Sequence, residues 1–220
     1  MGTTIKEVLA RNIEDNIAPV IYFHQLDPEI AAQEVREYVF TTRPSTQVHQ
    51  VGGIHEQMVD LLTNIFVAIE KGHKLPASWI SGYFGSGKSS FAKLLGLALD
   101  GMVLPDGKGM DEALLERDDT SNAEELKAAF IRLQAKVSSK AVIFDIGTAA
   151  KNNESIPHTI YRQILEKIGY SSHDGVAQFE VALEDEGRYE EFLLLYKEQY
   201  GKDWAEKRSG GLAPQQFRAI

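Results

Sequence analysis

Eight residues of the chain, GYFGSGKS at 82–89, have the types and spacing needed to hold a nucleoside triphosphate. They match the pattern G-x-x-x-x-G-K-[ST] at each fixed position. In such a loop the backbone N–H groups point at phosphate oxygens, and glycines let the backbone approach them closely. We therefore predict a phosphate-binding loop that opens a helix, whose free N–H groups and positive end favour an anion.

The predicted ligands of this loop are ATP and Mg²⁺. Lys88 is expected to contact the β- and γ-phosphates and to stabilise their charge, and the Ser89 hydroxyl is expected to join the shell of the magnesium ion. The other residues predicted to contact the nucleotide are Gly82, Gly85, Ser86, Gly87 and Ser90. The competing interpretation is a glycine-rich turn that happens to carry a surface lysine.

Hydrolysis of a triphosphate needs a further acidic group, and Asp145 is the best candidate for it. Asp145 follows four apolar residues in the run AVIFDI, which predicts a strand buried on both faces. An aspartate at the end of such a strand can hold Mg²⁺ through water. The next residue is Ile146, where many ATPases have a glutamate that orients the attacking water. A structural interpretation therefore competes, in which Asp145 caps the following loop GTAAKNN.

The elements around these motifs predict an α/β fold. Strand-like apolar runs at ASWISG and AVIFDI alternate with segments that have helical spacing of apolar residues. This alternation is typical of the three-layer P-loop NTPase fold, with a mostly parallel sheet. Trp79, beside the loop, is expected in the core. Asp27 and Pro28 predict the cap and the first turn of an earlier helix.

We expect an N-terminal arm at 1–45 and the first part of a P-loop NTPase domain at 46–220. The arm combines the helical pattern TIKEVLARNIED with short β-prone runs. Tyr38, Val39 and Phe40 near its end are candidates to pack on an adenine base, and strand core explains them equally well. The chain stops in the apolar-ended segment RSGGLAPQQFRAI, so we expect a domain that is truncated at its C-terminus.

Composition excludes several classes of protein and site. The net charge of −9 argues against strong nonspecific binding of nucleic acid. The chain has no cysteine, which excludes disulfides and thiolate metal sites. Neither a membrane-spanning apolar stretch nor a secretory signal is present, and we expect a cytoplasmic protein without membrane contact. The six histidines fit no metal-binding spacing, and we expect them in loops or on the surface.

Four stretches together resemble the N-terminal region of the large P-loop ATPase of bacterial BREX phage-resistance systems, the BrxC/PglY type. They are IKEVLARNIEDNIAPVIYFHQLD, EVREYVFT, SWISGYFGSGKSSFAKLLG and VIFDIGTAAKNNESIPHTIYRQIL. The resemblance implies a much longer, AAA-like protein that acts in antiviral defence. It implies other BREX components and a second copy of the protein as partners, and action on phage DNA, although this acidic segment itself does not indicate DNA contact. The resemblance also implies that the magnesium-binding Asp-Glu pair lies beyond Ile220, which would assign Asp145 to an earlier strand.

Three hypotheses for function follow. The first is an ATP-binding segment of a large bacterial defence ATPase, with hydrolysis expected of the full-length protein and little turnover by this segment. The second is a self-contained small P-loop enzyme such as a kinase, with Asp145 as its magnesium or base residue. The third is a scaffold module whose loop senses nucleotide or no longer binds it. A kinase should have a lid segment with clustered arginines, and the sequence shows none.

Overall fold

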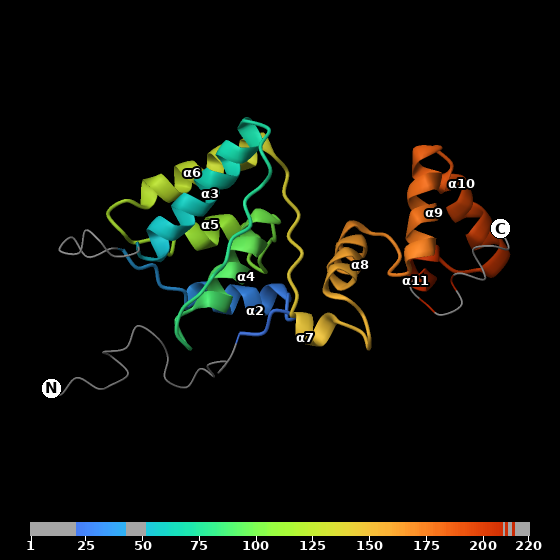
Figure 1. Ribbon diagram of the computed structural model, residues 1–220, viewed down its shortest axis with the longest axis horizontal. Coiled ribbons are helices and arrows are strands. Elements are labelled where there is room, and N and C mark those ends of the chain that lie inside the picture. Colours follow the sequence, from blue (N-terminus) through green and yellow to red (C-terminus); the bar gives the residue numbers. More distant parts are fainter. Residues whose placement is uncertain (1–20, 43–51, 209, 211–212, 214–220) are drawn as a thin grey trace. The chain divides into compact units, whose positions relative to one another are not determined.

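The computed structural model describes residues 21–42, 52–208, 210 and 213, and the chain divides into two compact units, Met1–Ala141 and Val142–Ile220 (Figure 1). Helices account for 57% of the described residues and strands for 1%, and these ranges contain no sheet. The predicted α/β fold is therefore wrong, and the described structure is all-helical. The predicted helix TIKEVLARNIED lies outside the described residues.

Both predicted strands are irregular segments that have no strand partner among the described residues. Residues 73–83 have no regular secondary structure, and Trp79, which we expected in the core, is 91% exposed. Residues 137–145 are irregular as well, with half-buried side chains at 142–144. A strand becomes part of a sheet only when a second strand satisfies its backbone N–H and C=O groups. A short apolar run predicts suitable side chains, and it contains no information about that partner.

The first unit is built from five described helices. These are α2 (Pro28–Arg36), α3 (Ile54–Glu70), α4 (Lys88–Leu99), α5 (Met110–Leu115) and α6 (Ala123–Lys136). Helix α3 packs along α6, and α4 packs against α2 and α5 (Figure 1). Apolar side chains from these helices are buried between them, among them Met58, Leu62, Leu94, Leu126 and Phe130. No helix in the described ranges is both long and apolar enough to cross a lipid bilayer.

Local signals placed several helix ends correctly. The Asp27 carboxylate caps α2 by accepting a hydrogen bond from Glu29 N at 2.8 Å, and Pro28 is the first helical residue. Helices α3 and α4 are each followed within two residues by a glycine with positive φ, +62° at Gly72 and +73° at Gly101. Helix α5 was not predicted, because six residues are too few to show helical periodicity.

A buried histidine corrects one expectation about the surface. His55, at the start of α3, is 1% exposed, and its Nδ1 lies 2.7 Å from Asp118 Oδ2. The Thr120 hydroxyl donates to the other oxygen of Asp118 at 2.6 Å. This cluster links the start of α3 to the connection between α5 and α6. His55 and Asp118 are 63 residues apart in sequence, so spacing along the chain could not reveal the pair.

The second unit contains the described helices α7 (Ile146–Ala149), α8 (Ile156–Ile168), α9 (Asp174–Asp185), α10 (Tyr189–Tyr200) and α11 (Trp204–Lys207). Its core is aromatic: the rings of Phe192 and Trp204 meet edge to face with centroids 5.2 Å apart. The fully buried carboxylate of Glu180 accepts hydrogen bonds from Trp204 Nε1 and Ser171 N, both at 2.6 Å. A buried carboxylate is tolerated because it is bonded in this way.

An ion pair in the second unit makes its stability depend on pH. Arg162 donates from Nε and Nη2 to the two carboxylate oxygens of Glu154, each at 2.9 Å. The hydrogen bond from Arg162, with help from the N–H of Lys151, holds the pKa of Glu154 well below its usual range. A pKa that is lower in the folded state contributes stability at neutral pH, and that contribution is lost as the pH falls.

We therefore expect the urea midpoint of the second unit to decrease between about pH 5 and pH 3. The Glu154→Gln variant should have a lower midpoint at pH 7 and a weaker dependence on acid. Fluorescence of Trp204, measured in a Trp79→Phe background so that no tryptophan of the first unit contributes, is a suitable probe. The same acid dependence in the wild type and in Glu154→Gln would contradict this explanation.

Candidate functional site

The predicted phosphate loop lies in the first unit, between the extended segment 73–83 and helix α4. Gly85 and Gly87 have φ of +78° and +80°, which is the left-handed region that residues with side chains rarely adopt. At Gly82 a Cβ atom would lie 2.8 Å from the Ser86 hydroxyl, which could turn away. Backbone conformation thus explains Gly85 and Gly87.

The N-terminus of α4 is suited to an anion. Helix α4 begins at Lys88, directly after Gly87, and it has neither a side-chain cap nor an acidic residue in its first turn. The first N–H groups of a helix have no acceptor within the helix, and the aligned peptide dipoles place partial positive charge there. A lysine at this end adds to the positive potential, and a bound anion would offset it.

Lys88 is held against the loop that precedes it. Its Nζ donates to the carbonyl oxygens of Gly82 at 2.9 Å and Tyr83 at 2.7 Å. An ammonium group has three donors, so one remains for a phosphate oxygen while the other two hold the loop. The Ser89 side chain, in the next position, is exposed. The lysine and the hydroxyl are therefore both accessible at the start of the helix.

A cavity of about 380 Å³ adjoins this loop. Its walls combine three groups of residues. The loop and the start of α4 contribute Gly85, Ser86, Gly87 and Ser90, and the apolar residues are Ile21, Ile30, Val39 and Ile54. The polar side chains are Gln33 and Glu34 of α2, and Glu37 and Tyr38 directly after it. This volume is within the range of small-molecule sites. Of the three arm residues that were candidates to face a base, Tyr38 and Val39 line the cavity. Phe40 is buried and packs edge to face on Tyr38.

A buried ion pair fixes one wall of the cavity relative to the loop. Lys93 of α4 is fully buried, and its Nζ donates to Glu34 Oε1 at 2.8 Å and to the carbonyl oxygen of Tyr22 at 3.1 Å. The pair connects α2, which carries cavity residues, to the helix that begins at the phosphate loop. Sequence reasoning missed it, although a single lysine in the apolar stretch FAKLLGLAL was a usable signal.

Asp145 belongs to the second unit and has a structural role there. It is the N-cap of α7, and its Oδ1 accepts a hydrogen bond from Gly147 N at 2.7 Å. This is the capping role that competed with the magnesium interpretation. A magnesium role for Asp145 stays a prediction, and the described residues contain no group of three or more histidine, aspartate and glutamate side chains that could hold a metal ion.

Substitution of Asp145 separates the two interpretations. Asp145→Ala should lower the free energy of unfolding by about 0.5–1 kcal/mol, because the first turn of α7 loses its cap. It should leave the dissociation constant for MgATP within about twofold of the wild-type value, which calorimetry can measure. Asp145→Asn retains the capping oxygen and serves as the control. A folded Asp145→Ala protein with a tenfold loss of MgATP affinity would favour the magnesium role instead.

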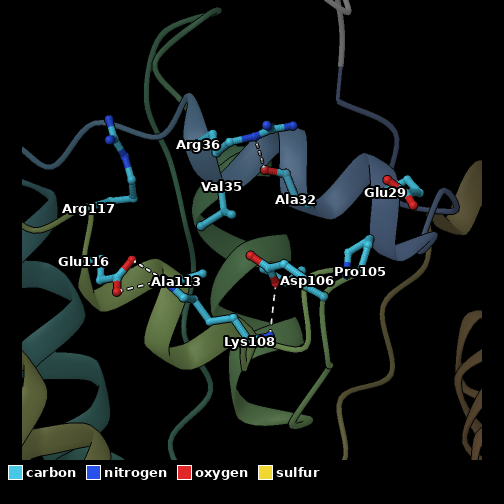
Figure 2. A pocket seen from close by; sticks show the side chains of 11 residues that line it. Glu29, Ala32, Val35, Arg36, Pro105, Asp106, Lys108, Ala113, Glu116 and Arg117 are labelled. Atoms are coloured by element: carbon cyan, nitrogen blue, oxygen red, sulfur yellow. Dashed lines mark hydrogen bonds and ion pairs between the residues drawn. The ribbon is translucent and has the colours of Figure 1, made fainter.

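A second cavity, of about 440 Å³, lies between α2 and α5 and has side chains of both charges (Figure 2). Lys108 Nζ is bound by the two carboxylate oxygens of Glu116 at 2.7 and 2.9 Å, which raises the lysine pKa. Arg36 and Arg117 donate from Nε to backbone carbonyl oxygens, and Figure 2 shows both guanidinium groups pointing away from Lys108. The cations here are engaged by the protein, so this cavity is the weaker candidate.

Comparison with known proteins assigns no family, since no family model matches the chain and no solved structure shows significant similarity to it. The interpretation of the site therefore depends on the chemistry of the loop and of the cavity beside it.

Proposed function

We propose that this chain binds MgATP through the loop at 82–89 and is the ATP-binding segment of a larger bacterial ATPase that acts in phage defence. The observation that supports nucleotide binding best is the cavity beside Gly85, Gly87 and Ser90. It joins a phosphate-binding loop to a wall of apolar side chains, as a nucleoside triphosphate requires. The resemblance of the four sequence stretches to BREX ATPases supports the role in defence.

The residues of the loop suit this ligand. The N–H groups at the start of α4 would bind phosphate oxygens, and Lys88 would add a charged hydrogen bond. The Ser89 hydroxyl would join the magnesium shell, and the metal would neutralise charge on the β- and γ-phosphates. The apolar wall formed by Ile30, Val39 and Ile54 would contact the base.

We further propose that this segment binds ATP with little turnover. Lys88 and the helix end stabilise phosphate charge, while the position after Asp145 is occupied by Ile146, which cannot orient a water molecule. The resemblance implies that the full-length protein supplies the missing acidic pair. Other BREX components, and further copies of the protein, are its proposed partners.

Calorimetric titration of the 220-residue chain with ATP tests the proposal. We expect saturable binding to one site, which weakens when Mg²⁺ is chelated. ATP at about 100 times its dissociation constant should add about 2.7 kcal/mol to the free energy of unfolding. Absence of both heat and thermal stabilisation at millimolar MgATP would contradict nucleotide binding. Appreciable steady-state hydrolysis by this chain alone would favour the self-contained enzyme.

A further inference from the structure

Two buried polar atoms in the wall of the loop cavity have no hydrogen-bond partner among the described residues. They are Glu34 Oε2 and the hydroxyl oxygen of Tyr38. Both residues line the cavity; the Glu34 side chain is 8% exposed, and Tyr38 is 6% exposed. Buried polar groups nearly always have a partner in the protein, in water or in a ligand. Neither atom is exposed, so a polar ligand in the cavity becomes their partner once the two side chains turn toward it.

The hydrogen-bonding character of each atom is defined by its surroundings. Lys93 Nζ donates a hydrogen bond to Glu34 Oε1 at 2.8 Å, which leaves Oε2 as the acceptor for a ligand. Burial raises the pKa of the Tyr38 hydroxyl well above its usual range, so the phenol retains its proton and can donate. The Phe40 ring packs edge to face on Tyr38, with centroids 5.2 Å apart, and restricts its movement. The wall thus offers one acceptor and one donor.

We propose that Glu34 and Tyr38 select the base of the nucleotide and favour adenine. This inference rests on the proposed function, because the loop must hold the phosphates for the base to reach α2. The 6-amino group of adenine would donate to Glu34 Oε2, and the neighbouring ring nitrogen, N1 or N7, would accept from the Tyr38 hydroxyl. The apolar side chains of Ile30 and Val39 would contact the faces of the ring.

The single free oxygen of Glu34 disfavours guanine. If guanine placed its O6 atom where adenine has the amino group, two acceptors would face each other. If it turned its N1–H and 2-amino edge to Glu34, it would need two acceptors, and Lys93 already holds the second oxygen. Either orientation leaves a polar group in the cavity without a partner, which lowers affinity.

Dissociation constants for ATP, GTP and purine riboside triphosphate test this inference. The last compound differs from ATP by the loss of the 6-amino group. With the wild-type chain we expect ATP to bind about tenfold more tightly than either analogue, as one lost hydrogen bond to a charged group implies. Equal affinities for all three would overturn the selection of adenine and leave the proposed function intact.

Two variants test whether Tyr38 and Glu34 cause the preference for adenine. Tyr38→Phe removes a hydroxyl that has no partner within the described structure, so the protein should remain folded and bind ATP several-fold more weakly. Glu34→Gln keeps an acceptor for Lys93 and presents an amide donor to the cavity, which should abolish the preference for ATP over GTP. Glu29→Gln, an exposed substitution on the same helix, is the matched control.

Inorganic tripolyphosphate separates binding of the phosphates by the loop from selection of the base by Glu34 and Tyr38. It should bind to the wild type, Tyr38→Phe and Glu34→Gln with equal affinity, since it has no base. Failure of both ATP and tripolyphosphate to bind the wild-type chain would overturn the proposed function and this inference with it. Unchanged ATP affinity in Tyr38→Phe, together with unchanged selectivity in Glu34→Gln, would overturn the assignment to these two residues. If Glu34→Gln does not fold, the inference is still tested by the affinities of the wild-type chain for the three nucleotides and by the ATP affinity of Tyr38→Phe.

Discussion

Replacing Lys88 with alanine is expected to lower the affinity of the chain for MgATP by about 10- to 100-fold, the loss that a charged hydrogen bond to phosphate implies. The fold should survive, because among the described residues Lys88 Nζ bonds two carbonyl oxygens of its own loop, those of Gly82 and Tyr83. Removal of a positive charge from the N-terminus of α4 even favours the helix slightly. Isothermal calorimetry gives the affinity, and circular dichroism the melting temperature.

Lys140→Ala is the matched control for this change. Lys140 lies in the same unit, and its side chain is 65% exposed, 4.0 Å from Asp100 Oδ1. Its removal lowers the net charge of the chain by the same amount, and it should leave MgATP affinity unchanged. Lys88→Arg tests geometry, since a planar guanidinium cannot replace a compact ammonium in a tight loop. Wild-type affinity in a folded Lys88→Ala protein would refute the site.

Replacing Lys93 with methionine is expected to destabilise the first unit by about 3–5 kcal/mol, the range observed when one partner of a buried ion pair is removed. Methionine is unbranched and only one heavy atom shorter than lysine, so most of the loss comes from the charge and little from a cavity. The Glu34 carboxylate, 8% exposed, would lose the bond to Nζ at 2.8 Å, and its Oε2 already has no partner in the described structure. The midpoint of urea unfolding measures the effect.

The double variant Lys93→Met, Glu34→Leu separates the ion pair from the packing around it. Removal of both charges should restore most of the lost stability, because apolar residues often replace a buried pair at little cost. Lys127→Ala, whose exposed pair with Glu124 spans 3.8 Å, should change stability by less than about 0.5 kcal/mol. Wild-type stability in Lys93→Met would show that the pair does not hold α2 against α4.

Features that depend on a few neighbouring residues could be predicted from the sequence. The cap at Asp27, the glycines after α3 and α4, and the conformation of Gly85 and Gly87 follow from side-chain chemistry and allowed backbone angles. The position of the glycine-rich loop at 82–87 directly before a helix also followed from its local pattern.

Features that depend on distant residues could not be predicted in this way. Whether the runs at 77–82 and 141–146 form strands depends on partners elsewhere in the chain, and the described structure gives them none. Glu34 and Lys93 are 59 residues apart, and no periodicity relates them. The cavity likewise combines side chains from Ile21 to Ser90, so its polar atoms became visible only after the helices were packed.

Amide hydrogen exchange of the chain with and without saturating MgATP tests the central claim most directly, because it locates the ligand as well as detecting it. We predict slower exchange at the loop and the first turn of α4, at 85–90, and weaker protection along α2. Exchange in α9 and α10 of the second unit should be unchanged, and Lys88→Ala should remove the protection. Unchanged exchange at 85–90 in a sample that binds MgATP, or protection confined to the second unit, would contradict the claim.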